Sequence, residues 1–239
     1  MNTQPHPIVL IPGYMLDAAL WREFETYLPE QYLVQHAAIG EGSTMREIAR
    51  HMATRLPEKF TLIGFSLGGY IARQLAADFP ERVASLVLIA SSLREDTPAQ
   101  RASKLRSIQA LSPDNFHGLS RSAIARSLHP QHAARRETIT LIQQMGARLG
   151  FEAFVNQSTL SRSDIPAVTL RCPTLVIASA EDAMRSQEEV KELADAIPNA
   201  QLKTIGDSGH MLPLEQPQRL AAVINDWLEK IKAERATQA

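Results

Sequence analysis

The stretch Gly64-Phe65-Ser66-Leu67-Gly68 decides the fold of this chain because of what lies on either side of it. The apolar run Phe60–Ile63 precedes it and predicts a buried strand, and residues 69–76 follow it with the pattern of a helix. A strand that turns sharply into a helix holds the residue at its tip in a strained conformation, and small flanking residues let the two elements pass each other. We therefore expect the Ser66 hydroxyl to project above a sheet edge, beside the free N–H groups of a helix N-terminus.

Apolar runs and helical periods alternate along most of the chain outside this turn. The expected strands are Ile8–Ile11, Tyr32–His36, Phe60–Phe65, Ala84–Ala90, Thr174–Ala180 and Gln201–Ile205. The expected helices are Ala18–Leu28, Thr44–Leu56, Leu67–Phe79, Ser186–Ile197 and Gln216–Lys232, and several of them end just before a proline. Runs rich in Val, Ile and Leu are typical of parallel strands that are buried on both faces. The alternation predicts an α/β fold with a doubly wound, mostly parallel sheet of about six strands.

One long segment interrupts this alternation. From residue 93 to residue 166 there is no convincing strand, and prolines and a glycine punctuate several helical stretches. We predict a core domain of residues 1–92 and 167–239, with residues 93–166 inserted as a helical cap, or lid. A cap would cover the strand ends, where open α/β sheets bind ligands. The alternative is a helical subdomain that lies away from the site.

Composition narrows the class of protein. The chain has 239 residues, 44% of them hydrophobic and 21% charged, with a net charge of -1. This balance is ordinary for a globular protein and does not favour nucleic acid or a membrane as a partner. The single cysteine, Cys172, cannot form an internal disulfide, and we interpret it as structural. The early apolar run Ile8–Ile11 is too short for a signal peptide or a membrane span, so we expect a cytoplasmic protein.

Three separated motifs carry a resemblance to a known family. The first is the Ser66 turn. The second is Ala178-Ser179-Ala180-Glu181-Asp182, which follows an apolar strand, and the third is Asp207-Ser208-Gly209-His210, with Glu215-Gln216-Pro217 downstream. In these motifs and their order the chain resembles the α/β-hydrolase superfamily over nearly its whole length. The likeness is to small bacterial carboxylesterases, cofactor-free haloperoxidase-like enzymes and meta-cleavage C–C hydrolases.

The resemblance implies a catalytic role for Ser66, Asp182 and His210. A serine hydroxyl is a poor nucleophile at neutral pH, so it needs an imidazole that takes its proton and a carboxylate that holds the imidazole in one tautomer. Ser66 would attack a carbonyl carbon, and water would later hydrolyse the acyl-enzyme. Glu181 and Asp207 are alternatives for the acid, and the spacing from the strand end favours Asp182.

The resemblance also implies two backbone N–H groups that stabilise the negative oxygen of the intermediate. One is that of Leu67, directly after the nucleophile. The other belongs to the loop after the first strand, at the residue that follows a glycine, which is Tyr14 here. Family members usually carry His-Gly at this place, whereas this chain has Pro12-Gly13. The Tyr14 ring could also form a wall of the pocket.

The resemblance therefore implies a serine hydrolase that cleaves a small carboxylic ester, without a cofactor or a metal. The chain shows no His-x-x-x-His or clustered Cys/His spacing of a metal site. The same residues would also suit hydrolysis of a C–C bond, or cofactor-free perhydrolysis or acyl transfer. A member of a different class, which binds a ligand without catalysis, is the remaining alternative.

The predicted cap has its own chemistry. Basic residues outnumber acidic ones in it, which leads to the hypothesis that it favours substrates or carriers with negative charge. A solvated helix surface is the plainer explanation. Five apolar residues of the cap either line an acyl pocket or pack together as the core of the cap, and we favour the packing role. They are Leu119, Ile124, Phe151, Phe154 and Val155. Three cap histidines, His117, His129 and His132, could contact substrate, although such residues are more often solvated or satisfied elsewhere.

Overall fold

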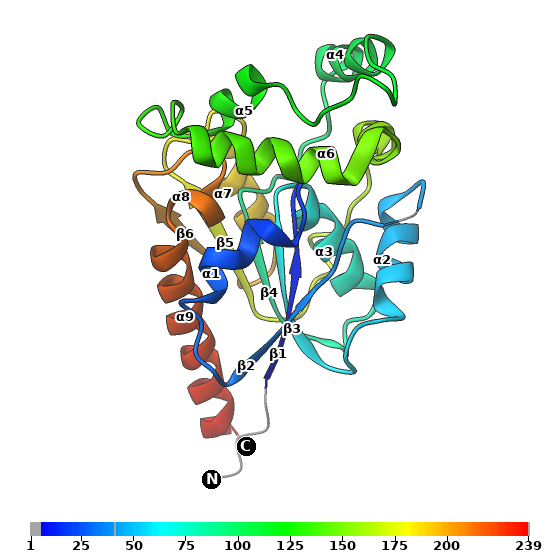
Figure 1. Ribbon diagram of the computed structural model, residues 1–239. Helices are drawn as coiled ribbons and strands as arrows, with labels where there is room; N and C mark the ends of the chain where they lie inside the picture. Colours follow the sequence, from blue (N-terminus) through cyan, green and yellow to red (C-terminus); the bar gives the residue numbers. More distant parts are fainter. Residues whose placement is uncertain (1–5, 41, 239) are drawn as a thin grey trace.

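A parallel sheet organises the computed structural model, which describes residues 6–40 and 42–238 (Figure 1). Its six strands lie in the order β2-β1-β3-β4-β5-β6. Their bounds are His6–Ile11 for β1, Tyr32–His36 for β2, Phe60–Phe65 for β3, Val83–Ile89 for β4, Thr174–Ser179 for β5 and Gln201–Ile205 for β6. Every neighbouring pair runs parallel, so the carboxyl ends of all strands share one edge. The predicted fold class is confirmed.

Helices cover both faces of this sheet and bury a separate apolar core on each. Helices α2 (Met45–Ala53), α3 (Leu67–Asp78) and α7 (Gln187–Ala196) pack on one face. The 3-10 helix η1 (Ala18–Trp21) and helices α1 (Arg22–Glu25), α8 (Leu212–Glu215) and α9 (Pro217–Gln238) pack on the other. Neighbouring residues of one strand divide between the cores, as Leu62 and Ile63 do. Two-sided burial explains why the central strands are continuous apolar runs.

Several sequence predictions about these elements were wrong. Residues 18–28 do not form one helix, because η1 and α1 share the segment and α1 ends at Glu25. The last helix begins at Pro217, after the separate turn α8, and continues to Gln238 instead of fraying after Lys232. Strands β2 and β6 were expected to be buried, yet most of their residues are partly or fully exposed. Each has a neighbour on one side only, since both lie at sheet edges.

Residues 93–166, all of which the structure describes, contain three helices and no strand. These are α4 (Pro98–Gln109), α5 (Arg121–Ser127) and α6 (Arg136–Thr159), and they lie together above one end of the sheet (Figure 1). The backbone of α6 is interrupted at Gly150, where φ is 82°. The role of residues 93–166 as a cap stays a prediction.

A buried arginine holds the two connections between these helices and the sheet. Arg73 on α3 is fully buried, and its guanidinium donates to the Ser92 carbonyl at 3.0 Å and to the Ile165 carbonyl at 3.3 Å. Burial lowers the pKa of Arg73 to about 10, so the side chain is still charged at neutral pH. Charge-assisted hydrogen bonds from one side chain thus fix where the chain leaves the sheet region and where it returns.

Candidate active site

The turn at Ser66 has the strained geometry that the sequence predicts. Ser66 lies between β3 and α3 with φ 51° and ψ -113°. A Cβ atom on Gly64 would lie 2.5 Å from the Gly68 carbonyl oxygen, and one on Gly68 would lie 2.3 Å from the Pro12 carbonyl oxygen. Side chains at either glycine would therefore force strand and helix apart. A strained, non-glycine residue held by such packing is typical of a functional site.

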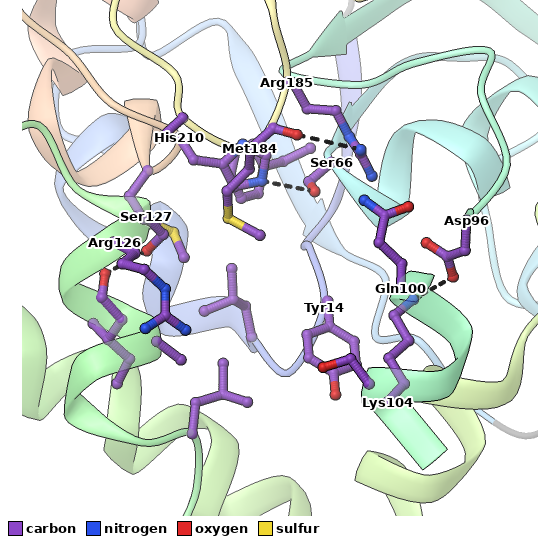
Figure 2. A pocket seen from close by; sticks show the side chains of 18 of the residues that line it. Tyr14, Ser66, Asp96, Gln100, Lys104, Arg126, Ser127, Met184, Arg185 and His210 are labelled. Atoms are coloured by element: carbon purple, nitrogen blue, oxygen red, sulfur yellow. Dashed lines mark hydrogen bonds and ion pairs between the residues drawn. The ribbon is translucent and has the colours of Figure 1, made fainter. Parts of the chain in front are cut away.

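The structure brings the three predicted catalytic side chains together. His210 Nε2 lies 2.9 Å from Ser66 Oγ, and His210 Nδ1 lies 2.7 Å from Asp182 Oδ2 (Figure 2 shows the first contact). The His210 and Asp182 side chains are 5% and 1% exposed. Since an ionised carboxylate only accepts hydrogen bonds, Nδ1 carries the proton and Nε2 of the neutral ring accepts from the Ser66 hydroxyl. This is the tautomer that can remove a proton from serine.

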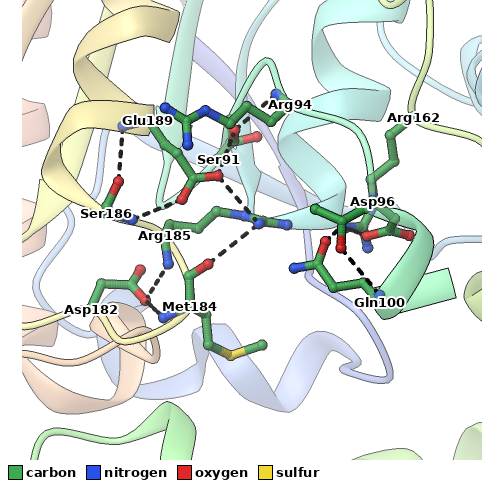
Figure 3. Close-up of polar contacts among 12 residues, drawn as sticks. Ser91, Arg94, Asp96, Gln100, Arg162, Asp182, Met184, Arg185, Ser186 and Glu189 are labelled. Atoms are coloured by element: carbon green, nitrogen blue, oxygen red, sulfur yellow. Dashed lines mark hydrogen bonds and ion pairs between the residues drawn. The ribbon is translucent and has the colours of Figure 1, made fainter. Parts of the chain in front are cut away.

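The two alternative acids lie elsewhere. Glu181 accepts a hydrogen bond from the Ser208 N–H at 3.1 Å, and Asp207 is exposed and forms an ion pair with Arg219. Asp182 is held instead by its own loop. Its Oδ1 accepts from the backbone N–H groups of Met184 at 2.7 Å and Arg185 at 2.9 Å (Figure 3). The loop after β5 thus orients the carboxylate whose other oxygen contacts the histidine.

The loop that carries His210 is tied to the helices above the sheet. The His210 N–H donates to the Ser127 carbonyl of α5 at 2.8 Å. The Glu215 carboxylate, whose side chain is 1% exposed, accepts from the Gly209 N–H at 2.9 Å and the His129 N–H at 2.6 Å. His132 Nδ1 lies 3.0 Å from the same carboxylate. One buried carboxylate therefore joins α8, the histidine loop and the segment between α5 and α6.

Sequence reasoning missed this role of Glu215. It expected His132 to be solvated, to have its hydrogen bonds satisfied elsewhere, or to lie near substrate. The described residues that line the cavity at Ser66 do not include His117, His129 or His132. The one available signal was Glu215, five residues after the histidine at the end of the third motif. A buried carboxylate with three donors from distant segments has no local pattern that predicts its partners.

Replacing Glu215 with glutamine should lower kcat about tenfold with little change in KM, and should lower the free energy of unfolding by about 2 kcal/mol. An amide has one acceptor oxygen, so it cannot serve the N–H groups of both Gly209 and His129. The backbone beside His210 would lose its fixed position, while the substrate cavity would keep its walls. Steady-state kinetics and denaturant unfolding would measure both effects.

The matched control is Glu181→Gln, the same change at an exposed residue that also contacts the loop before His210. It should keep kcat within about twofold of wild type, and the free energy of unfolding within about 0.5 kcal/mol of wild type. Equal effects of the two variants would refute the special role of Glu215.

The two N–H groups predicted to stabilise negative charge belong to Leu67 and Tyr14. Leu67 is the first residue of α3, so its N–H has no intrahelical acceptor. Tyr14 lies on the loop after β1. The N–H of Met15 on that loop donates to Gln157 Oε1 of α6 at 2.8 Å, and the Tyr14 hydroxyl contacts Ser158 Oγ at 2.7 Å. Bonds from α6 therefore hold a loop that lacks the usual histidine, and the donor role of Leu67 and Tyr14 stays a prediction.

A cavity of about 500 Å³ opens beside Ser66 and His210, between the sheet edge and the helices above it (Figure 2). The Tyr14 ring lines it, and burial raises the pKa of Tyr14 to about 12, so its hydroxyl stays protonated at neutral pH. The apolar residues of the predicted cap occupy both of the expected places. Leu119 and Ile124 line the cavity, and Phe151, Phe154 and Val155 pack with Phe116 and Met15 in a cluster that Leu119 also contacts.

Comparisons with known proteins agree with this fold. A family model described as alpha/beta hydrolase fold matches residues 46–217. The chain is similar to the pimeloyl-[acyl-carrier protein] methyl ester esterase of Aromatoleum aromaticum, with 28% identity over 92% of this chain and 96% of the relative. Among solved structures it is similar to a thermophilic esterase from Thermogutta terrifontis with malate bound, with a TM-score of 0.80 and 27% identity over 95% and 90% of the two chains. The enol-lactonase from Burkholderia xenovorans LB400 shares the fold, with a TM-score of 0.82 and 19% identity over 94% and 91% of the two chains.

Proposed function

Because this chain belongs to the α/β-hydrolase fold family, we propose that it is a serine hydrolase that cleaves small carboxylic esters with Ser66, His210 and Asp182. The observation that carries the proposal is the continuous set of hydrogen bonds from Ser66 through His210 to Asp182, buried at the wall of a cavity. Relatives named as esterases over nearly the whole chain support ester cleavage. The cytoplasmic location expected from the sequence stays a prediction.

The geometry supports a two-step reaction. Ser66 Oγ attacks the ester carbonyl as His210 Nε2 takes its proton, and Asp182 stabilises the imidazolium that forms. Negative charge develops on the carbonyl oxygen, beside the N–H groups of Leu67 and Tyr14. His210 then gives the proton to the departing alcohol, which leaves an acyl group on Ser66. Water attacks this acyl-enzyme with His210 again as the base, and the acid is released.

The names of two relatives point to candidate substrates. A pimeloyl-[acyl-carrier protein] methyl ester esterase acts on the methyl ester of an acyl group, which supports a small alcohol as the leaving group. The Thermogutta terrifontis esterase was solved with malate, a small dicarboxylate, which supports a cavity that accepts small polar acids. Methyl esters of short acids, including a pimeloyl methyl ester, are therefore the first compounds to assay.

The test combines turnover with labelling. The protein should hydrolyse a short-chain p-nitrophenyl ester, and a fluorophosphonate probe should label one serine per chain and abolish that activity. Complete labelling without ester turnover would favour C–C hydrolysis or a silent ligand-binding member. Absence of both labelling and turnover would overturn the proposal.

A further inference from the structure

Three cationic side chains line one part of the cavity wall, and two of them share a single carboxylate. Asp96 contacts Arg162, with Arg162 Nη1 2.7 Å from Oδ1, and it also forms an ion pair with Lys104 on α4. Arg185, from the loop that holds Asp182, lines the same cavity. In Figure 2 the Arg185 side chain lies near Ser66, with Asp96, Gln100 and Lys104 beyond it, and Figure 3 shows Arg162 beside Asp96.

This cluster has more positive than negative charge. Outside the cavity wall, Glu189 lies 3.7 Å from Arg185. In the wall itself these three cations accompany one carboxylate, Asp96, in a partly buried place where screening by water is weak. Burial lowers the pKa of Lys104, and the nearby Arg162 and Arg185 lower it further. Burial and then Arg185 likewise lower the pKa of Arg162, against the opposing effect of Asp96. The cations therefore repel one another, and an anion among them would relieve that repulsion.

The two arginines also keep unused hydrogen-bonding capacity. Within the described part of the chain, the buried Nε atoms of Arg162 and Arg185 have no hydrogen-bond partner. The Arg162 side chain is 8% exposed and the Arg185 side chain 13%. Buried polar groups in folded proteins are nearly always satisfied, so these two guanidinium groups can each take a further acceptor. Gln100 and Ser103 add neutral polar groups to the same wall.

We propose that this cluster, defined by Lys104, Arg162 and Arg185, binds a carboxylate on the acyl part of the substrate. The inference rests on the proposed function and names its substrate class: monoesters of small dicarboxylic acids. A carboxylate carries the negative charge that a cationic wall attracts, and its two coplanar oxygens match a guanidinium. A group on the acyl part stays attached to Ser66 through both steps, so the cluster would hold the substrate during acylation and deacylation. A cavity of about 500 Å³ has room for such an acyl chain.

A matched pair of esters tests the inference. p-Nitrophenyl hydrogen adipate and p-nitrophenyl hexanoate have acyl chains of equal carbon number. The adipate chain ends in a carboxylate, and the hexanoate chain ends in a methyl group. The wild-type protein should prefer the anionic ester in kcat/KM by about tenfold or more. Lys104→Gln should reduce that preference about tenfold while kcat/KM for the neutral ester stays near wild type, which shows that the variant is folded. Arg126→Gln, a cation on the other side of the cavity, is the control and should keep the preference (Figure 2).

A binding measurement separates this inference from the proposed function. Ser66→Ala should bind free adipate in calorimetry at constant ionic strength, and the neutral hexanamide and phosphate much more weakly. Turnover of both esters without an anionic preference would overturn the inference and leave the esterase proposal standing. Tighter binding of phosphate than of adipate would overturn the choice of carboxylate. If neither ester is hydrolysed, the proposed function fails, and adipate binding by Ser66→Ala still decides whether the cluster is an anion site.

Discussion

Replacing Ser66 with alanine should lower kcat for a short-chain p-nitrophenyl ester by about five orders of magnitude or more. The hydroxyl is the only group of the side chain that changes, and in the proposed reaction it forms the covalent bond to the acyl group. Alanine keeps the Cβ atom, so the strained backbone at φ 51° is neither relieved nor worsened. The lost hydrogen bond to His210 should cost only about 1 kcal/mol of stability. The variant should therefore be folded, able to bind substrate, and inactive.

The control for this variant is Ser103→Ala, which removes a serine hydroxyl from another part of the same cavity. It should change kcat less than threefold and keep full labelling by a fluorophosphonate probe, whereas Ser66→Ala should lose the label. Persistent labelling of Ser66→Ala, or activity above about one hundredth of wild type, would show that another group is the nucleophile.

The site could be predicted in outline from the sequence because its parts obey local rules. A strand followed by Gly64, Ser66 and Gly68 predicts a sharp turn, and each glycine is required by a backbone contact shorter than any Cβ atom allows. Asp182 and His210 each follow an expected strand. Since the strands are parallel, their carboxyl ends meet at one edge, and residues far apart in the chain come together there.

Features that depend on contacts between distant segments could not be predicted in this way. Hydrophobic pattern marks Tyr32–His36 and Gln201–Ile205 as strands, but it does not show that they lie at the edges, where most of their residues stay partly or fully exposed. The partners of Glu215 come from the histidine loop and from the segment after α5. The cationic cluster likewise combines α4, the segment after α6 and the loop after β5. The excess of basic residues in the predicted cap indicates that the cap is positively charged. Which of these residues reach the cavity is visible only in the fold.

Replacing Asp182 with asparagine should lower kcat about 10⁴-fold, although the side chain changes by a single group. Oδ1 of Asp182 accepts hydrogen bonds from the Met184 and Arg185 N–H groups, so the amide oxygen of asparagine must take that place. The amide NH₂ then faces His210 Nδ1 and donates to it. In the neutral ring this moves the proton to Nε2, which can no longer accept a proton from Ser66. The loss should appear in kcat for the ester, and the fold should be little affected because the backbone N–H groups keep their acceptor.

The same experiment decides between Asp182 and the two acids that the sequence left open. Glu181→Gln and Asp207→Asn make the equivalent change at carboxylates that contact the Ser208 N–H and Arg219, respectively, and both should keep kcat within about threefold of wild type. An ¹H NMR spectrum would add an independent measurement. The Nδ1 proton between His210 and Asp182 should give a strongly downfield signal in wild type, because it lies in a charge-assisted hydrogen bond of 2.7 Å, and the signal should be absent from Asp182→Asn. A variant of Glu181 or Asp207 that loses this signal and the activity together, while Asp182→Asn retains both, would place the acid elsewhere.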